Sequence, residues 1–485
     1  MCDGWGNITV KDIIRAARGR LVSGSPDRVI AGISTDSRKI RPGELFWALV
    51  GDTYDGHDFA RPAMEKAAAG VVVEEGWARS EQGRKDLDSI QSHPAQGAVI
   101  CVDDTLKALG DLAAWWRHQY PVQVVGITGS SGKTTTKEMT ARILELGRRT
   151  LKNQGNFNNL IGLPLTLLEL TRDHACAVLE MGMNHPGEIG RLTEIADPDI
   201  GMILNVGMAH LEGVSDLDGV ARAKTEMMAK ISPRGLMILN GDDIPLMRRA
   251  SLFSRQKITF GLGKTNDVRA SNIQDMGLEG IRFLLEYRGE SWPVHVRVPG
   301  RHHLKNALAA AAAALSLDEA PENIMRGLAA FSGMRGRFQV TWLDAGGLLV
   351  DDTYNANPFS LAAAMESIGA LVQKGGRIIV GFGDMLELGE AASEAHQEAG
   401  RKAASGGAWC VFAMGEYAGV VAAGARMAGL SRDRVGVVGT HEEMTRKIRE
   451  RMSPGDVVLL KGSRRMQMEK VAKGLRGMGV TASPP

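Results

Sequence analysis

A short stretch in the first third of the chain has the residue types that bind the phosphates of a nucleotide. Lys133 follows a glycine-containing bend and precedes Thr134 and Thr135. An apolar run leads into the bend and a helical pattern follows it, so several backbone N–H groups can surround one anion. The lysine adds positive charge, and the Thr134 hydroxyl can ligate Mg²⁺. The expected nucleoside-triphosphate site comprises Gly129, Ser130, Ser131, Gly132, Lys133, Thr134 and Thr135.

This bend departs in one respect from the usual phosphate-binding motif G-x-x-x-x-G-K-[ST]. Ile127 stands where the first glycine is required, and glycines occur at positions 126 and 129 instead. The plain alternative is an ordinary strand-to-helix turn with a solvated lysine. The strand and helix patterns on its two sides favour the phosphate site.

Three further side chains with metal-binding or charge-carrying chemistry follow later apolar runs. Glu180 ends one run, His210 follows the next, and Lys224 lies in a helical pattern soon after. Ligands of open parallel sheets lie beyond the carboxyl ends of the strands, and Mg²⁺ needs only one or two protein oxygens. Thr134 and Glu180 can therefore hold one ion. By themselves, the three residues have plain alternatives: a paired structural carboxylate, a capping imidazole and a solvated helix lysine.

The elements that must position these groups alternate between strand and helix. Strand-like runs occupy residues 122–127, 177–181, 201–206, 236–239, 347–350, 377–380, 409–413, 435–438 and 457–460. This pattern predicts an α/β protein, and 485 residues are too many for one core. We expect a mixed α/β domain at 1–121, a central, doubly wound, mainly parallel domain at 122–338 and a C-terminal Rossmann-like domain at 339–485.

Two polar segments follow strand-like runs in the first domain. Hydroxyls, an arginine and short acidic side chains at strand ends suit a polar, anionic small molecule. Turn and capping chemistry explains each segment equally well. The candidate residues are Ser34, Thr35, Asp36, Ser37, Arg38, His57, Asp58 and Phe59.

The composition is that of an ordinary globular protein. The formal net charge of +2 gives no electrostatic reason to expect a nucleic-acid or membrane-surface partner. The four cysteines are widely spaced, which favours free thiols in a reducing compartment. The N-terminus has no basic and apolar leader, and the alanine-rich run 307–317 is too short to span a bilayer. We therefore expect a cytoplasmic protein without membrane insertion, and a monomer.

Several motifs, in the same order along the chain, resemble those of the Mur ligase family. The resemblance runs from about residue 30 to 475 and rests on Gly126–Thr135, Gly155–Asn159, Glu180–Gly182, Asn205–Gly207, Ala209–Glu212, Ala223–Glu226, Gly300–His302 with Asn306, Gly336-Arg337 and Asp351–Pro358. Within the family, the chain is most similar to members that join D-alanyl-D-alanine to UDP-N-acetylmuramoyl-tripeptide. The resemblance implies an ATP- and Mg²⁺-dependent ligase of peptidoglycan synthesis, which forms an acyl phosphate and then an amide bond.

The resemblance also implies roles for individual residues. It implies that Thr134 and Glu180 hold the first of two Mg²⁺ ions, that His210 holds the second, and that CO₂ carbamylates Lys224 into an anion facing the second metal. ATP contacts are implied for the phosphate-binding segment 129–135, called the cradle below. They are also implied for Asn240, His302, Asn306, Arg337 and Asp352. Substrate contacts are implied for the two polar segments of the first domain and for Asn158, Asn159, Asn355, Asn357, Lys461 and Arg464. His303 stands where the family usually has an asparagine.

Three other functions are compatible with a phosphate-binding α/β chain. A diamino-acid-adding ligase of the same family should carry an Asp-Asn-Pro-Arg-type run in its last domain, and none is present. A folate polyglutamate synthase should lack the first domain. A P-loop switch that hydrolyses ATP only to change shape would not need Lys224 chemistry.

Overall fold

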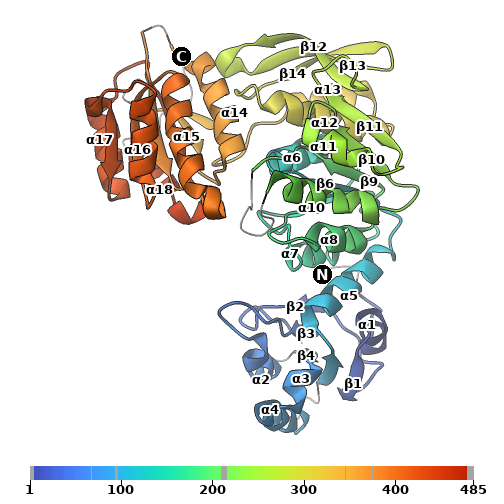
Figure 1. The fold of residues 1–485 in the computed structure, drawn as a ribbon. Coiled ribbons are helices and arrows are strands. Elements are labelled where there is room, and N and C mark those ends of the chain that lie inside the picture. The colour runs from blue at the N-terminus through green and yellow to red at the C-terminus, as the bar shows by residue number, and fades with distance from the viewer. Residues whose placement is uncertain are drawn as a thin grey trace. The chain divides into compact units, whose positions relative to one another are not determined.

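The computed structural model describes residues 5–66, 68–92, 97–208, 216–344, 346–373 and 375–477. They form the α/β class of structure that the alternating sequence pattern predicts (Figure 1). Contacts divide the chain into two compact units. Unit 1 comprises Met1–Gly126, Arg148–Met181 and Arg191–Asp199, and unit 2 comprises Ile127–Gly147, Gly182–Gly190 and Ile200–Pro485.

Unit 1 begins with a five-stranded sheet in the order β1-β5-β4-β3-β2. Strands β2 to β5 are parallel, and β1 is antiparallel to β5. The strands are β1 (Arg20–Ser23), β2 (Gly32–Ser34), β3 (Glu44–Trp47), β4 (Gly70–Glu74) and β5 (Ala98–Val102). The helices are α1 (Val10–Ala17), α2 (Ala60–Glu65), α3 (Glu75–Arg79), α4 (Glu81–Gln91) and α5 (Thr105–Arg117).

One face of this sheet is covered by α2 and α4, which bury Met64 and Leu87 against Phe46 and Val71. This packing orders the loops after β2 and β3, which contain the two polar segments. Unit 1 continues with three strands in the order β6-β8-β7, of which β7 and β8 are parallel. These elements are β7 (Thr150–Lys152), α7 (Gly162–Leu167) and β8 (Cys176–Glu180), together with β6 (Gln123–Thr128) and α8 (Glu188–Ala196), through which the boundary with unit 2 passes.

Unit 2 contains a run of six strands that pair in the order β9 to β14. The strands are β9 (Ile200–Ile203), β10 (Leu236–Asn240), β11 (Lys257–Gly261), β12 (Val268–Asp275), β13 (Ile281–Tyr287) and β14 (Glu290–Val296). The helices are α6 (Lys133–Leu144), α10 (Leu217–Lys230), α11 (Ile244–Ala250), α12 (His303–Ser316) and α13 (Pro321–Ala329). The alanine-rich helix α12 is almost wholly buried, because its small side chains allow close packing on all sides.

Strands β12, β13 and β14 are antiparallel, whereas β9 to β12 are parallel. The sequence pattern did not predict this antiparallel extension. Its signal was present in the period-two burial of Ile281, Phe283 and Leu285, and in a turn where Arg288 and Gly289 have φ of 50° and 85°.

The C-terminal part of unit 2 forms a six-stranded sheet in the order β15-β16-β20-β17-β18-β19, parallel except for β15. The strands are β15 (Gln339–Trp342), β16 (Leu348–Asp352), β17 (Ile378–Gly383), β18 (Ala408–Met414), β19 (Val435–Val438) and β20 (Val457–Lys461). The helices are α14 (Pro358–Ile368), α15 (Ala392–Ser405), α16 (Ala418–Met427), α17 (His441–Arg451) and α18 (Glu469–Arg476).

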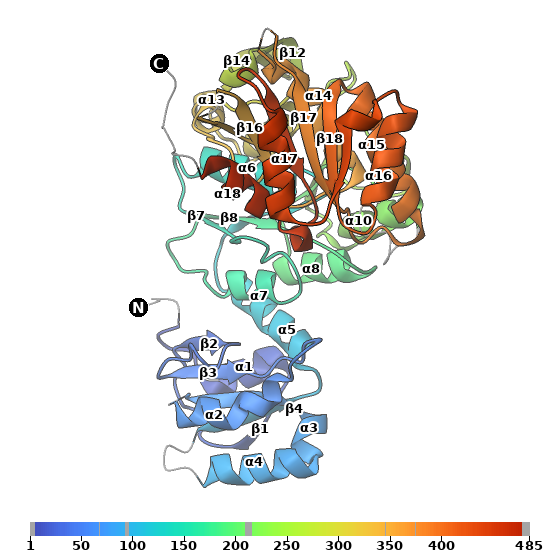
Figure 2. The same ribbon diagram turned by 90° about the vertical axis from the view of Figure 1, so that its left-hand side faces the viewer.

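Figure 2 shows α15 and α16 on one side of β17 and β18, and α17 and α18 on the other. Helices on both faces of a mainly parallel sheet are what the alternating pattern after residue 340 predicts. No helix in the described ranges has both the length and the apolar character needed to cross a bilayer.

Candidate active site

The predicted phosphate cradle is the turn between β6 and α6. Gly132 caps the helix in the left-handed region, with φ of 84°. A Cβ atom at this position would lie 2.4 Å from Oδ1 of Asn306, so only glycine fits. Asn306 also accepts a hydrogen bond from the Thr136 hydroxyl at 3.4 Å. Helix α12 thus contacts the cradle through Asn306, one of the predicted ATP-binding residues.

Two residues after β9 hold the cradle loop in place. Asn205 accepts the Ser131 N–H at 2.9 Å and donates its amide to the Ser131 carbonyl at 3.0 Å. The Ser130 hydroxyl exchanges hydrogen bonds with the backbone of Gly207 at 2.9 Å. These bonds fix the loop before any ligand binds, and fixed dipoles bind an anion with less reorganisation. Lys133 donates to the Gly129 carbonyl at 2.8 Å.

Lys224 of α10 is almost completely buried, with 1% of its side chain exposed. Among the described residues, it makes no hydrogen bond or ion pair. Burial lowers the pKa of its amine well below the ordinary value, and the charge of Lys133 lowers that pKa further. The structure therefore places a lysine held toward its neutral form within electrostatic reach of the cradle lysine.

Thr134 is buried at the first turn of α6, and its hydroxyl oxygen accepts a hydrogen bond from the Arg337 guanidinium at 2.9 Å. Arg337 also lies over the ring of Tyr354, 4.1 Å from its centre. Arg337 was predicted to serve the nucleotide, and it does lie beside the cradle. The neighbouring Thr135 is buried as well.

Glu180 lies in unit 1 at the end of β8, with only 3% of the residue exposed. Its Oε1 accepts a hydrogen bond from Nδ2 of Asn158 at 2.8 Å. Its Oε2 is buried and has no hydrogen-bond partner within the described residues. A buried carboxylate oxygen without a donor fits a divalent cation, since Mg²⁺ takes oxygen ligands and few of them from protein.

The loop after β7 surrounds this carboxylate. Asn153 donates to the Glu180 carbonyl at 2.9 Å and accepts its N–H at 2.9 Å. The exposed Asn159 accepts the N–H groups of Ile161 and Gly162 at the start of α7. Asn158 and Asn159 were both predicted to contact substrate, yet here one holds Glu180 and the other caps a helix. His210, the remaining predicted metal ligand, lies outside the described residues.

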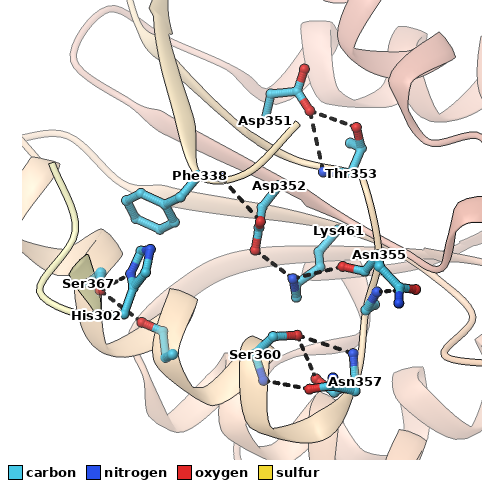
Figure 3. Close-up of polar contacts among 12 residues, drawn as sticks. His302, Phe338, Asp351, Asp352, Thr353, Asn355, Asn357, Ser360, Ser367 and Lys461 are labelled. Atoms are coloured by element: carbon cyan, nitrogen blue, oxygen red, sulfur yellow. Dashed lines mark hydrogen bonds and ion pairs between the residues drawn. The ribbon is translucent and has the colours of Figure 1, made fainter. Parts of the chain in front are cut away.

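The residues predicted to hold adenine and ribose lie at the ends of β10 and α12. His302 contacts Phe338 edge-on, with ring centres 4.9 Å apart, and its Nδ1 lies 3.2 Å from the Ser367 hydroxyl (Figure 3). Burial, followed by the charge of Lys461, lowers the pKa of His302 to about 4. Burial and the Lys461 charge both disfavour the imidazolium, so the ring of His302 is neutral at neutral pH.

The adjacent His303 is buried, and its Nδ1 has no hydrogen-bond partner in the described part of the chain. Burial lowers its pKa well below the ordinary value, and the neighbouring His302 adds to the effect. Asn240 is also buried, but its amide is satisfied: it donates to the Leu204 carbonyl and accepts the Asp242 N–H. Asn240 therefore orders the loop after β10. It would affect a bound nucleotide only indirectly, by holding that loop in place.

Lys461 is buried, with 1% exposed, and its ammonium donates to Oδ2 of Asp352 at 2.5 Å and to the Asn355 carbonyl at 3.1 Å (Figure 3). The other carboxylate oxygen of Asp352 accepts the Phe338 N–H at 3.1 Å. Burial raises the pKa of Asp352, and the charge of Lys461 opposes that rise. Lys461 and Asp352 thus bind each other in the structure, whereas the sequence predicted separate contacts to substrate and ATP.

Asn357 caps α14 by accepting the Ser360 N–H at 2.8 Å, and its amide donates to the Ser130 carbonyl at 3.4 Å. The start of α14 therefore contacts the cradle loop. Asn355 is exposed, and Arg464 is exposed with an ion pair to Glu469 at 2.9 Å. Of the predicted substrate contacts in this part, Asn355 and Arg464 remain accessible.

The first polar segment of unit 1 is a turn in which the Ser34 hydroxyl donates to the Asp36 carbonyl at 3.0 Å and accepts the Asp36 N–H at 3.2 Å. Arg38 forms a two-pronged pair with the Asp36 carboxylate at 2.9 and 3.0 Å. This pair lowers the pKa of Asp36 to about 2. Thr35 and Ser37 are partly exposed. The segment is ordered by its own hydrogen bonds, as the capping alternative requires, and Arg38 faces solvent.

His57 is buried and fully engaged. Its Nδ1 lies 2.6 Å from the Asp55 carboxylate, and its Nε2 accepts the Glu74 N–H at 2.9 Å. Its ring stacks on Trp77 at 5.1 Å. His57 therefore fixes the loop after β3, and the exposed Asp58 and Phe59 are the members of this segment that a ligand can reach.

Sequence reasoning missed the loop-fixing roles of Asn153 and Asn205. A signal existed, because Asn153 directly follows β7, Asn205 is the second residue after β9, and an amide side chain can extend the hydrogen bonding at a strand end. The left-handed backbone of Phe338, with φ of 52°, had no sequence signal.

Comparison with known families gives three matches along the chain. The Mur ligase family catalytic domain matches residues 29–117, the Mur ligase middle domain 127–314, and the Mur ligase glutamate ligase domain 336–464. Two similar proteins are the UDP-N-acetylmuramoyl-tripeptide--D-alanyl-D-alanine ligases of Bacillus subtilis and Escherichia coli. The first is 36% identical over 96% of this chain and 98% of its own, and the second 35% identical over 98% and 99%.

Two solved structures resemble the whole chain. MurF from Acinetobacter baumannii superposes with a TM-score of 0.84 at 33% identity, covering 97% of this chain and 98% of its own. MurF ligase from Thermotoga maritima, in complex with ADP, gives a TM-score of 0.80 at 27% identity, covering 92% and 97%. Both matches extend over all three sheets.

Proposed function

The chain belongs to the Mur ligase family, and from this premise we propose that it joins D-alanyl-D-alanine to UDP-N-acetylmuramoyl-tripeptide at the expense of ATP. The product is the UDP-muramoyl-pentapeptide precursor of peptidoglycan. Support comes from the near full-length similarity to two ligases with that activity. The observation that carries the proposal is Lys224, a buried amine without a counter-ion in the described residues and close to the cradle lysine.

The reaction is the one that the resemblance to the Mur ligases implies. The terminal carboxylate of the tripeptide attacks the γ-phosphorus of ATP, which forms an acyl phosphate and releases ADP. The free amine of the dipeptide then attacks the acyl carbon, and the tetrahedral intermediate expels phosphate and loses a proton. In this scheme, Lys133 and the amides of residues 129–135 hold the β- and γ-phosphates. Arg337 and Asn306 approach the same nucleotide.

Two Mg²⁺ ions are part of the proposal. As the family resemblance implies, Thr134 and Glu180 would hold the first, and His210 and the modified Lys224 would hold the second. The buried, donor-free Oε2 of Glu180 fits such an ion. When bound, Mg²⁺ neutralises charge on the triphosphate and so reduces its repulsion of the attacking carboxylate.

We propose that Lys224 acts as a carbamate. Its neutral Nζ bonds to the carbon of CO₂ and releases one proton, which converts a cation into an anion. Only a neutral amine can react in this way, and burial supplies that form by lowering the pKa of Lys224. An unmodified, protonated Lys224 would instead repel the metals.

In this scheme, residues 1–121 form the domain that binds the UDP-substrate, and residues 122–338 form the domain that binds ATP. Residues 339–485 form a C-terminal domain that closes over the ligands. Arg38, Asp58 and Phe59 contact the UDP-sugar, with Ser34–Ser37 and His57 ordering their loops. His302 and the Asn240 loop border the adenine and ribose, while Asp352 and Lys461 hold the junction beside them. Asn355, Asn357 and Arg464 serve the dipeptide side. We also propose that the protein works as a monomer in the cytoplasm, where ATP is available.

The test is phosphate release by the purified protein with ATP and Mg²⁺, omitting each substrate in turn. The ligase proposal requires both the UDP-muramoyl tripeptide and D-alanyl-D-alanine, and a UDP-pentapeptide as product. Equal ATP hydrolysis without either substrate would favour the P-loop switch. Release that depends on a diamino acid in place of the dipeptide would favour the related ligase.

A second measurement tests domain closure. An acyl phosphate must be shielded from water, so solution scattering should show compaction when an ATP analogue and the UDP-substrate are added together. An unchanged radius of gyration would exclude that closure.

A further inference from the structure

The Glu180 carboxylate is held by two asparagines whose arrangement leaves one oxygen available. Asn153 pairs with both backbone groups of Glu180, donating to its carbonyl and accepting its N–H, each at 2.9 Å. The pairing of β7 with β8 ends at Lys152 and Val178. The side chain of Asn153 therefore supplies the hydrogen bonds that a further residue of β7 would have made.

The same asparagine also orders the loop that follows. Nδ2 of Asn153 donates to the Phe157 carbonyl at 2.8 Å, directly before Asn158. Asn153 is buried, with 2% exposed, so this link is protected from water. The backbone of Glu180 and the position of Asn158 are therefore fixed by one side chain.

Asn158 completes the arrangement through a different contact. Its Nδ2 donates to Oε1 of Glu180 at 2.8 Å, and Oε2 is buried without a partner in the described residues. A hydrogen bond to one carboxylate oxygen sets the rotation of the Glu180 carboxylate about χ3. That torsion is otherwise broad for glutamate, so the direction of Oε2 depends on Asn158.

We propose that Asn158 is a positioning residue that aims Oε2 of Glu180 at a divalent cation, with Asn153 as its anchor. The inference rests on the proposed function for the presence of that cation. Asn158 thus acts through Glu180, whereas the sequence predicted a substrate contact for it. Partners of this kind typically change metal affinity by about 10- to 100-fold when removed.

The experiment measures Mn²⁺ binding to the protein–ADP complex by electron paramagnetic resonance, with Mn²⁺ as the probe for Mg²⁺. We expect Asn158→Ala and the similarly sized Asn158→Leu to raise the Mn²⁺ dissociation constant about tenfold or more. ADP affinity without metal should not change. The matched control is Asn323→Ala, because Asn323 of α13 donates to the carboxylate of Glu319, just before that helix, at 3.1 Å. Its Mn²⁺ affinity should equal that of the wild type.

A double-mutant cycle decides whether Asn158 acts through Glu180. In the Glu180→Gln background, which should itself bind Mn²⁺ weakly, adding Asn158→Ala should have no further effect. An equal loss in both backgrounds, or an unchanged affinity in Asn158→Ala, would overturn the positioning role while leaving Glu180 as ligand. Wild-type affinity in Glu180→Gln would overturn both the ligand and the positioning role. Ligase activity with both substrates, measured separately, tests the function itself.

Discussion

Lys224 and Lys461 are two buried lysines in unit 2, each 1% exposed, with opposite surroundings. Lys461 at the end of β20 donates to the Asp352 carboxylate and to a carbonyl. Lys224 in α10 has no ion pair in the described residues, and the positive charge of Lys133 lowers its pKa further. A buried lysine with a counter-ion can keep its charge, whereas burial without one drives the amine toward neutrality. In the proposed function, this difference separates a structural lysine from a reactive one.

The largest expected effect is on activity at Lys224. Lys224→Ala should lose about a hundredfold or more of ligase activity, the scale seen when a charge-stabilising group is removed from an active site. ADP binding should remain. Added short carboxylic acids should restore part of the activity by replacing the carbamate, as measured by phosphate release. Near-wild-type activity without rescue would place Lys224 with Lys461 as a structural residue.

A stability change is expected at Lys461. Lys461→Met leaves Asp352 buried without its counter-ion and should lower the free energy of unfolding by about 3–5 kcal/mol. The double replacement with Asp352→Leu removes both charges and should recover most of that loss. Denaturant titration measures both variants. A double variant as unstable as the single one would show that the ion pair is not what stabilises this junction.

The pH dependence of stability should also distinguish the two lysines. Because the pKa of Lys224 is lowered in the folded state, the unfolded chain binds an extra proton between that pKa and about 10.4. The free energy of unfolding should therefore rise with pH through this window. Lys224→Met should be more stable than the wild type at neutral pH, with a flatter dependence. Unfolding measured at several pH values without CO₂ checks this, and a variant less stable than the wild type would contradict it.

The smallest effect concerns the reach of the Lys461 charge. The pKa of His302, about 4, lies below its ordinary value of about 6.5, so stability should fall as pH drops through that interval. Lys461→Met removes one of the two causes, and the pKa of His302 should rise in an NMR titration, while histidine signals other than those of His302 and the adjacent His303 stay unchanged. No movement would indicate that the Lys461 charge does not reach His302.

The sequence predicted the α/β class and the cradle, because both depend on a local pattern of glycines, apolar residues and charge. The role of Lys224 was implied only by the resemblance to the Mur ligase family. The sequence did not reveal that Lys224 is buried, since a helix lysine is usually solvated. Nor did it predict that His57 and Lys461 form internal hydrogen bonds. Lys461 and Asp352 lie far apart in the chain, and no spacing encodes their contact. His57 bonds to the nearby Asp55, but its second bond, to the Glu74 N–H, depends on how the chain folds.

The antiparallel strands β12 to β14 were missed for another reason. Their alternating burial is a weak signal beside the strong strand–helix alternation before and after them. Asn158 shows the opposite case. Its motif was recognised, but sequence alone could not tell a contact to substrate from a contact to Glu180.

Phe338 is held in an unfavourable backbone conformation by its neighbours. A non-glycine residue at φ of 52° costs about 1–2 kcal/mol relative to the right-handed region. The N–H of Phe338 donates to the Asp352 carboxylate, and its buried ring contacts His302. Turning the backbone at Phe338 would relieve the conformational cost but would disturb both contacts. The backbone before β15 is therefore coupled to Asp352 on one side and to His302 on the other, so a change at either residue would act on the same few bonds.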